Sequence, residues 1–574
     1  MEKDAKGFWH LRISDVKLGE QYRYRLGDGP GHADPASFYQ PQGVHGPSQV
    51  WDHGSFHWSD SAWMGLALEE CVLYELHPGT FTPEGTLEAV ATKLAYLKEL
   101  GVNALEIMPV NQFPGKRGWG YDGAYIYAVQ NSYGGPDSLK KLVDACHREG
   151  LAVILDVVYN HLGPEGNYLA EFGPYFTTKY ATPWGQALNF DGADSDPVRD
   201  FFIENALYWF QEFHLDGLRL DAVHQIYDTS AMPFLAEMAE RVKCFSLRAG
   251  RERYLIAESD LNDTRLLRSR QAGGYGMHAQ WLDDYHHCLE TMLNQGKSPY
   301  ARDYGDPSQF LKACREGYVY SGQYCPTRRK RFGNTSADRL GREFMVFIQN
   351  HDQVGNRLTG DRLITLVDFE SAKLAAGAVV LSPYIPLLFM GEEYGETNPF
   401  LFFADYEDQD LVDAVREGRR KEFGFLEESR EMPDPVAEET FRRSSLDWSK
   451  PDRGRNRVHL DFYRTLLSLR RRIPALRYAD KENLEVNGFD RVFSFRRWRP
   501  DPGGKPTEMT FCLLNFNLKS ARARVQPVGE WELLLDSADR RWEGPGSRAP
   551  SQASAGREIE LQPMSFVLYR MRGA

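Results

Sequence analysis

Four short stretches of the chain bring carboxylates together with basic or amide side chains. They are DVVYNH (156–161), GLRLDAVH (217–224), AES (257–259) and NHD (350–352). Cleavage of a glycosidic bond requires two carboxyl groups in one site, because one protonates the leaving oxygen while the other attacks the anomeric carbon. We therefore predict that Asp221 is a nucleophile and that Glu258 is a general acid.

The other polar residues of these stretches suit supporting roles at the same site. Arg219 precedes Asp221 by two residues, on the same face of a strand, where a guanidinium keeps the carboxylate ionised and oriented. Asp352 is a third acid, expected to stabilise an oxocarbenium-like transition state. Asp156, taken alone, is as compatible with helix capping as with catalysis. Candidate hydrogen-bond partners of the sugar are His161, His224 and His351.

Each stretch follows a short apolar run that predicts a buried strand. Between the runs lie segments with apolar residues at i, i+3 and i+4, which indicates parallel βαβ units. Eight such strands close a (β/α)₈ TIM barrel, whose active site lies at the carboxyl ends of the strands. Neighbouring strands are about 4.8 Å apart, which suits the gap of about 5 to 5.5 Å in a retaining pair. The predicted strands are 71–77, 102–110, 151–158, 216–221, 254–259, 278–282, 343–349 and 385–390.

The pattern of the chain changes twice, so we expect a barrel between two β domains. Residues 1–60 alternate apolar and polar side chains and then become rich in Gly and Pro, which predicts an N-terminal β-sandwich-like domain, too short to be complete. The catalytic barrel is assigned to 61–476, with insertions at 291–342 and 400–455. A C-terminal β-sandwich is expected at 477–574.

Composition limits the partners and the compartment. The formal net charge is −13 over 574 residues, which argues against nucleic acid and anionic membranes as partners. The seven cysteines contain no CxxC pair, so we expect neither disulfides nor a zinc knot. The N-terminus has no apolar signal segment, and no run is long enough to span a bilayer. These features together predict a cytoplasmic protein.

Metal-dependent hydrolysis is the main alternative for His and Asp at barrel strand ends. Metal-dependent amidohydrolases need a His-x-His pair on the first strand, whereas this strand ends in LHP (76–78). HExxH, P-loop and GxSxG motifs are also missing from the sequence. We therefore expect no metal and no cofactor.

The four stretches, in this order, resemble the signature motifs of the α-amylase superfamily, and the resemblance extends from about residue 70 to 395. It implies that Asp221 is the nucleophile, Glu258 the acid/base and Asp352 the transition-state stabiliser. It also implies that Tyr121, from WGYDG (119–123), stacks on the sugar in subsite −1. Further residues that it places around this subsite are Asp156, His161, Arg219, His224 and His351.

Within the superfamily, YELHPGTFTPEGT (74–86) is similar to a branch that holds branching enzymes, isoamylase-type debranching enzymes and maltooligosyltrehalose trehalohydrolases. The trehalohydrolases match best, through ESDLND (258–263), WLDDYHH (281–287) and MGEEYGE followed by PFLFFADYED (390–408). This similarity implies hydrolysis of the α-1,4 bond between a maltooligosaccharide and a terminal trehalose, and pairing with a maltooligosyltrehalose synthase. The residues that it implies for the trehalose side are Asp283, Asp284, Tyr285, His286, His287, Gln353 and Asn356.

Two departures and two alternatives stay open at this point. The N-terminal domain is shorter than in that family, and Tyr285 stands where Phe is expected. A glucan-branching or isoamylase-type debranching enzyme uses the same catalytic residues, so the acceptor must discriminate. A catalytically inactive glucan-binding protein would have no need for Asp221, Glu258 and Asp352 together.

Overall fold

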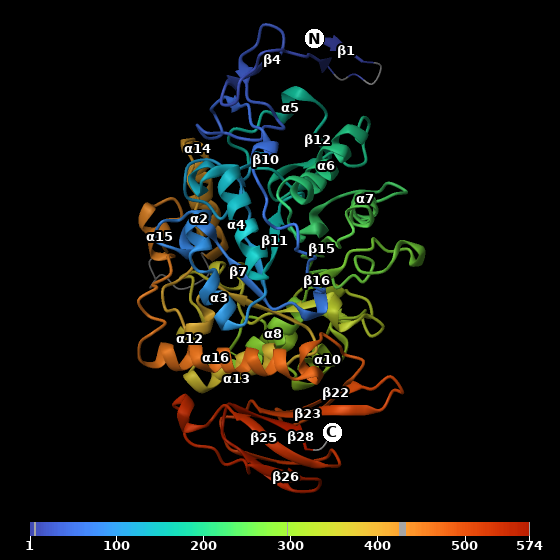
Figure 1. Cartoon of the computed structure of the whole chain (residues 1–574), viewed down its shortest axis with the longest axis vertical. Helices are drawn as coiled ribbons and strands as arrows, with labels where there is room; N and C mark the ends of the chain where they lie inside the picture. The colour runs from blue at the N-terminus through green and yellow to red at the C-terminus, as the bar shows by residue number, and fades with distance from the viewer. Residues whose placement is uncertain (5–6, 8, 296, 424–431, 573–574) are drawn as a thin grey trace.

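The computed structural model describes residues 1–4, 7, 9–295, 297–423 and 432–572. An N-terminal segment lies at one end of the molecule, a barrel forms the middle, and an antiparallel sheet lies at the other end (Figure 1). In this described part of the chain, no helix combines the length and apolar character needed to cross a membrane. The predicted order of a barrel followed by a C-terminal β domain is confirmed.

Eight parallel strands close the barrel, and each falls within a range predicted from the sequence. Every barrel strand pairs in parallel with the next barrel strand along the chain, and the last barrel strand pairs with the first. The register sets Asp156 beside Arg219 and Leu220 beside Ala257. The strands are β7 (Leu73–Leu76), β8 (Ala104–Ile107), β11 (Ala152–Val157), β14 (Gly217–Leu220), β15 (Tyr254–Ala257), β16 (Ala279–Trp281), β19 (Phe344–Val346) and β20 (Ile385–Phe389).

Helices cover the outside of the barrel, as continuous apolar strands require. They include α3 (Leu94–Leu100), α4 (Gly135–Glu149), α6 (Asp196–Glu212), α7 (Phe234–Ala249), α8 (Asp283–Leu293) and α13 (Phe369–Val380). Gly101, Gly150 and Gly250 end three of them in the left-handed conformation. Such a residue stops a helix and lets the chain turn into the next strand.

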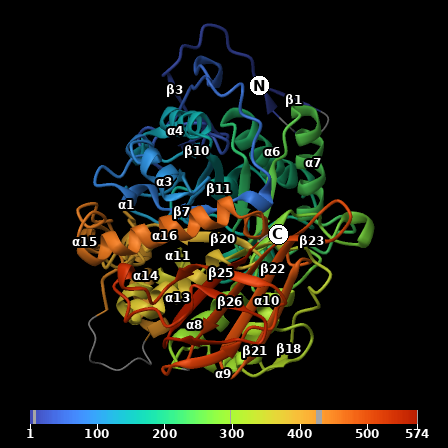
Figure 2. The same cartoon turned by 60° about the horizontal axis from the view of Figure 1, so that its bottom comes forward.

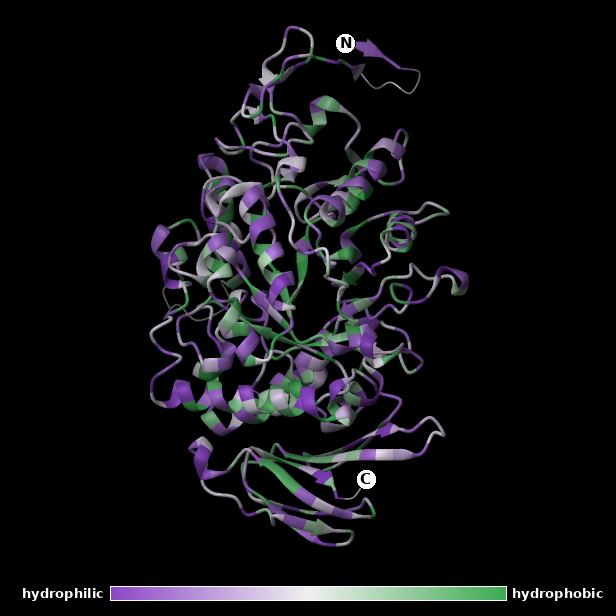
Figure 3. Cartoon of the chain, in the orientation of Figure 1, coloured by the Kyte–Doolittle hydropathy of each residue, from purple (hydrophilic) through white to green (hydrophobic). Residues whose placement is uncertain are grey.

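The barrel interior is apolar toward the amino ends of its strands. The apolar colouring of the central strands is visible in Figure 3. One buried cluster draws side chains from nearly every strand, among them Leu73, Ala104, Ile154, Ile256, Ala279, Met345, Ile385 and Leu387. This packed layer forms the floor beneath the polar residues at the carboxyl ends.

The predicted N-terminal β-sandwich is wrong for the described residues. This region contains only antiparallel pairs of two-residue strands: β1 (Glu2–Lys3) with β2 (Trp9–His10), β3 (Gln21–Tyr22) with β6 (Ser48–Gln49), and β4 (Tyr24–Arg25) with β5 (Gly31–His32). The Gly- and Pro-rich sequence that follows interrupts the alternation that longer strands need. Residues beyond it pack on the barrel instead, where Val44 joins a cluster with Tyr125 and Ala128.

The C-terminal region is a two-layered antiparallel sandwich, as predicted. Its larger sheet has the order β21-β22-β23-β28-β25-β26, and β24 pairs with β27 across the core. Figure 2 shows these strands in front of α13 and α16 (Gly454–Arg472). The strands are β21 (Leu484–Phe489), β22 (Val492–Pro500), β23 (Pro506–Asn515), β24 (Ala521–Arg524), β25 (Glu530–Asp536), β26 (Gln552–Ser554), β27 (Glu558–Leu561) and β28 (Ser565–Met571).

The barrel and the C-terminal sandwich share an apolar contact. Gly377 of α13 lies so close to the Phe566 ring that an added Cβ would sit 2.3 Å from it. The Phe462 ring packs 5.4 Å from Trp542. A glycine is therefore needed at position 377 for the sheet to approach the helix. The domain boundaries drawn from the sequence stay predictions.

The two predicted insertions contain short elements. Residues 291–342 hold α9 (Ala301–Tyr304), α10 (Pro307–Glu316) and a small pair, β17 (Tyr324–Cys325) with β18 (Lys330–Arg331). Residues 400–455 hold α14 (Gln409–Phe423) and α15 (Glu438–Arg443), and 424–431 lie outside the described residues. The sequence patterns did not predict the hairpin of β12 (Phe176–Thr182) and β13 (Gly185–Leu188), which follows β11.

Candidate active site

Arg219 lies at the centre of the carboxylates predicted from the sequence. Its Nη1 donates to Asp156 Oδ2 over 2.7 Å and to Asp221 Oδ1 over 3.0 Å. Its Nη2 lies 3.3 Å from Glu258 Oε2. The guanidinium carbon stands 4.2 Å from the centre of the Trp281 ring, a cation–π contact. One buried cation therefore gathers three carboxyl groups from three adjacent strands.

Asp221 begins immediately after β14, and two groups fix its carboxylate. Arg219 binds one oxygen, and the Asn160 amide donates to the other over 2.7 Å. Asn160 also donates to the Asp221 carbonyl and contacts the His161 ring. The nucleophile is thus oriented from both sides. Asn160 was not among the predicted site residues, although its place in the DVVYNH stretch marked it.

Glu258 follows β15 and lies beside Asp221. Its Oε2 accepts a hydrogen bond from the Ala222 backbone N–H over 2.5 Å. Ala222 has a φ of +37°, a left-handed conformation that costs free energy for a residue with a side chain. Burial raises the pKa of Glu258 well above its usual value, and the carboxylates of Asp221, Asp352 and Asp283 add to this, while Arg219 opposes it. A raised pKa keeps a carboxylic acid protonated near neutrality, as a general acid requires.

Tyr121 joins two sides of the site through its hydroxyl group. The hydroxyl donates to Asp156 Oδ2 over 2.5 Å and lies 2.7 Å from His351 Nε2. The Tyr121 and His351 rings are stacked, with centroids 5.2 Å apart. Burial raises the pKa of Asp156 to about 7, although Arg219 acts against it. Asp156, Tyr121 and His351 therefore form one hydrogen-bonded wall.

Asp352 and its neighbours lie beside this wall, on α11 (His351–Gly355). The Asp352 carboxylate is about one-third exposed and lies 3.4 Å from His351 Nε2. Asn356 Nδ2 donates to Asp352 Oδ1 over 3.0 Å, and Gln353 accepts from the Tyr300 hydroxyl over 3.0 Å. Asp352 can therefore reach a bound sugar while its neighbours hold it in place.

His161 and His224 lie at two edges of this group. His161 Nε2 is 3.1 Å from the Tyr121 carbonyl, and the ring stacks on Trp184 at 4.1 Å, with only 4° between the planes. Trp184 stands between β12 and β13 and is half exposed. His224 Nε2 lies 3.6 Å from Asp260. Trp184 thus adds an aromatic ring to the rim that the motif analysis did not identify.

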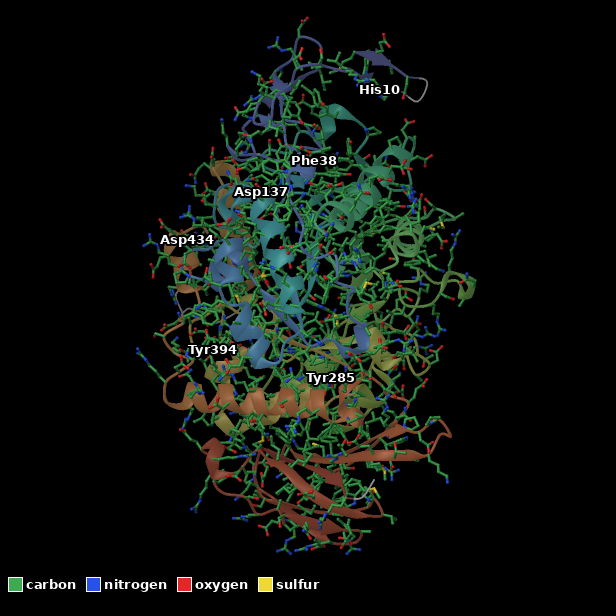
Figure 4. All side chains as sticks on the ribbon, in the orientation of Figure 1. His10, Phe38, Asp137, Tyr285, Tyr394 and Asp434 are labelled. Atoms are coloured by element: carbon green, nitrogen blue, oxygen red, sulfur yellow. The ribbon has the colours of Figure 1, made fainter. Side chains whose placement is uncertain are left out.

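Tyr285 and Asp284, predicted on the trehalose side, are both buried, and their contribution to that subsite stays a prediction. The Tyr285 side chain lies in the core, where its hydroxyl donates to the Ala378 carbonyl over 2.7 Å. Figure 4 shows Tyr285 on the side of the barrel that faces the C-terminal sheet. The Asp284 carboxylate accepts from the side chains of Asn262 and Tyr304 and from two backbone N–H groups. The helical period of α8 turns these two side chains away from the rim.

The other predicted residues of α8 are Asp283, His286 and His287. Burial raises the pKa of Asp283 to about 8, and Asp352 is the next cause, which indicates that the two carboxylates are close. His287 is partly exposed, and its ring centre lies 3.9 Å from that of Tyr300. His286 is buried, with its ring 5.9 Å from Phe347. Contacts of Asp283, His286 and His287 with substrate stay predictions.

A cavity of about 280 Å³ opens beside the general acid. His224 and Ser259 form its inner side, and Tyr180 and Tyr227 contribute stacked rings 5.2 Å apart. Apolar rings with a few polar groups suit the faces and hydroxyls of sugars. Asp221, Glu258 and Asp352 do not line this cavity, which adjoins the site through His224 and Ser259.

Among the described residues, one group has a geometry suited to a metal ion. Ligand atoms of His45, Glu165 and Glu407 lie within 4.8 Å of one another. His45 Nε2 is 3.2 Å from Glu165, and Glu165 also accepts from the Glu407 backbone N–H. Two of the three residues are exposed. This group takes no part in the arrangement around Arg219.

Comparisons with known proteins place the chain among α-glucan enzymes. Residues 35–206 match the family of the alpha amylase catalytic domain. The chain is 50% identical to the malto-oligosyltrehalose trehalohydrolase of Saccharolobus solfataricus, over 82% of this chain and 81% of that protein. It is 42% identical to the Rhizobium sp. protein of the same name, over 98% and 92% of the two chains. These relatives span nearly the whole molecule, including the site.

A solved structure agrees with these relatives. A Salmonella typhimurium protein, whose name places it with the alpha amylases, superposes with a TM-score of 0.87 at 39% identity, over 98% of this chain and 92% of that one. By contrast, the chain is only 24% identical to a 1,4-alpha-glucan branching enzyme of Pseudoalteromonas atlantica, over 99% of this chain and 78% of that enzyme. Identity thus separates the two kinds of relative clearly.

Proposed function

Since the chain belongs to the malto-oligosyltrehalose trehalohydrolase family of glycoside hydrolases, we propose that it hydrolyses maltooligosyltrehalose at the α-1,4 bond before the terminal trehalose, with retention of configuration. The observation that carries the mechanism is the joint binding of Asp221 and Glu258 by Arg219. One guanidinium can bind both only if the two carboxyl groups are close. A short separation leaves no room for a water molecule between sugar and nucleophile, as retention requires.

In the first step, Asp221 attacks the anomeric carbon while Glu258 donates its proton to the glycosidic oxygen. Free trehalose then leaves, and a glycosyl ester remains on Asp221. The contacts of Arg219 and Asn160 hold the Asp221 carboxylate for in-line attack. The burial of Glu258, which raises its pKa well above the usual value, supports its role as the acid. Asp352, whose carboxylate is about one-third exposed, stabilises the charge that develops on the ring.

In the second step, Glu258 acts as a base. Having lost its proton, its carboxylate takes a proton from a water molecule, and that water attacks the anomeric carbon of the ester. The C–O bond to Asp221 breaks, and a maltooligosaccharide of the original α configuration is released. Neither step needs a group beyond these side chains and water.

The test is incubation with maltotriosyl-trehalose, followed by chromatography of the products. We expect free trehalose and maltotriose in equal amounts, with the α-anomer of maltotriose formed first by NMR. An Asp221→Asn variant is the control, because it keeps the shape of the side chain and removes the nucleophile. A shift of the iodine spectrum of amylose, without trehalose release, would show a branching enzyme instead. A first-formed β-anomer would overturn the retaining mechanism.

The biological setting is a separate part of the proposal. A glucan with a terminal trehalose must be made by an enzyme that rearranges the reducing end of a maltooligosaccharide, so we propose a maltooligosyltrehalose synthase as the functional partner. The seven cysteines are all free, and six of them are buried. Free thiols fit a reducing compartment, which supports the cytoplasm as the location.

A further inference from the structure

Glu75 is a buried carboxylate of the first barrel strand that no motif assigned to the site. It lies on β7, and its side chain is about 2% exposed, so a bound sugar cannot reach it. Its Oε1 is 2.5 Å from His351 Nδ1, and its Oε2 accepts from the His351 backbone N–H over 2.9 Å. Two contacts to one residue fix both the ring and the start of α11.

The contact with Glu75 determines whether Nε2 of His351, the ring nitrogen that faces Tyr121, carries a proton. Burial alone would lower the pKa of His351, but the carboxylates of Asp352 and Glu75 outweigh it and raise the pKa to about 9. At neutral pH both ring nitrogens therefore carry a proton. Nδ1 donates to Glu75, and Nε2 donates to the Tyr121 hydroxyl at 2.7 Å. That hydroxyl must then give its own proton to Asp156, in agreement with the 2.5 Å contact.

Glu106 shows what the same side chain does without such a partner. It lies on β8, with its Cα opposite that of Glu75. In the part of the chain that the structure describes, neither of its carboxyl oxygens has a hydrogen-bond partner. Burial raises its pKa well above the usual value, and Glu75 adds to this. Glu106 is thus a neutral acid, while its neighbour carries the charge that meets His351.

We propose that Glu75 is a positioning residue of the reaction, which holds His351 as an imidazolium with Nε2 directed at Tyr121 and Asp352. Through these two residues it orients the wall of subsite −1 and the transition-state stabiliser without touching substrate. This inference rests on the proposed function, because it concerns the same site. It predicts that activity requires the protonated form of His351.

Several charged groups face His351, and the test must separate them. Asp352 lies on its own helix, Glu75 and His77 belong to the first strand and its end, and Tyr121 comes from the loop after β8. Arg219 from β14 disfavours the imidazolium, and Glu106 from β8 is neutral. The general acid Glu258 also loses its proton at high pH, and this would obscure the titration of His351.

An α-maltotriosyl fluoride substrate removes the contribution of the acid. Fluoride leaves without protonation, so the loss of the Glu258 proton no longer stops the first step. We expect the wild-type rate on this substrate to fall above a pH of about 9, where His351 loses its proton. In Glu75→Gln the negative charge is gone, the imidazolium is less stable, and the fall should move to lower pH by at least about one unit. The kcat should drop about 10- to 100-fold, with KM changed less.

Glu106→Gln is the matched control, because it exchanges a neutral acid for a neutral amide in the adjacent strand. It should keep kcat within about threefold and leave the high-pH fall in place. Equal pH shifts in both variants, or an unshifted profile in Glu75→Gln, would overturn the proposal. If Glu75→Gln does not fold, His351→Gln gives a second reading, since it should abolish the high-pH fall, and a fall that persists there contradicts the proposal. A wild-type enzyme that cleaves neither the fluoride nor maltotriosyl-trehalose would instead refute the proposed function.

Discussion

The two ends of the barrel interior have opposite chemistry although the same strands build both. On four adjacent strands, the inward residue near the amino end is apolar or glycine, and the residue two positions later carries a charge or a buried acid. The pairs are Leu73 and Glu75, Ala104 and Glu106, Ile154 and Asp156, and Gly217 and Arg219. The floor is fixed by packing, whereas the upper layer is fixed by a few directed contacts to Arg219 and His351.

The difference between the apolar floor and the charged upper layer explains how so many charged groups can be buried in the site. A carboxylate removed from water is costly unless it is paired or protonated. Both solutions occur side by side: Asp156 and Asp221 share Arg219, while Glu106 is held neutral. The apolar floor keeps the strand ends from moving apart, so the pairs keep their geometry. Substitutions of the paired charges in the upper layer should therefore lower activity, whereas substitutions in the floor should lower stability and leave activity nearly unchanged.

The largest effect is expected for the two reacting carboxyl groups of the upper layer. Asp221→Ala and Glu258→Ala should each lower turnover of maltotriosyl-trehalose by about 10⁴-fold or more, with little change in thermal unfolding. Azide, added as an external nucleophile, distinguishes the role of Asp221 from that of Glu258. In Asp221→Ala it attacks the sugar directly and should give a β-glycosyl azide from the fluoride substrate. In Glu258→Ala it attacks the ester on Asp221 and should give the α-azide.

NMR of the azide products checks this assignment. The same azide anomer from both variants would contradict the division of roles between Asp221 and Glu258. The floor variant Leu387→Ala serves as a control, since it should give no azide product at all.

The next effect concerns the cation that joins the carboxylates. Arg219→Met leaves Asp156, Asp221 and Glu258 without their counter-charge, so kcat should fall about 100-fold or more and the free energy of unfolding by about 3 kcal/mol. Arg470 is a matched control, because it is equally buried and donates to the carbonyls of Val380, Ser382 and Tyr384. Arg470→Met should cost similar stability while the folded enzyme keeps its kcat. Equal losses of kcat in the two variants would show that Arg219 acts only through folding.

A substitution in the apolar floor should lower stability and leave kcat nearly unchanged. Leu387 of β20 is fully buried in the lower layer and pairs with Leu73 of β7. Leu387→Ala removes packed methyl groups and should lower the free energy of unfolding by about 2 to 5 kcal/mol. The kcat of the folded enzyme should stay within about twofold, because the contacts of Arg219 do not involve this residue. Denaturant unfolding and an activity assay on the same sample test the separation. A large loss of kcat would show that the layers are coupled.

The sequence predicted the parts of the molecule that follow a regular pattern. All eight barrel strands were predicted because buried parallel strands are continuously apolar, and the charged strand ends stood out against them. Glu75 and Glu106 were not singled out, since a carboxylate inside a strand looks like any polar residue until its neighbours are known. Trp184 was missed for a related reason, because only the β12–β13 hairpin brings it to His161.

The prediction of an N-terminal β-sandwich failed for a different physical reason. Alternation of apolar and polar residues predicts strands only if enough of them pair, and two-residue pairs add few cross-strand contacts. Residues that follow gain more by packing on the barrel, as the Ser59 side chain does when its hydroxyl donates to Asp144 over 2.8 Å. Whether an alternating segment forms long paired strands therefore depends on tertiary contacts, and the sequence pattern does not reveal these contacts.

Tyr285 gives the smallest expected effect and the sharpest test of the boundary between site and core. Its motif suggested a subsite, but its hydroxyl bonds Ala378 of α13 in the core. Tyr285→Phe removes this hydrogen bond to the Ala378 carbonyl, so the free energy of unfolding should fall by about 1 kcal/mol. Both kcat and KM for maltotriosyl-trehalose should stay within about twofold. A clear rise in KM with unchanged stability would instead show that Tyr285 contributes to the trehalose subsite.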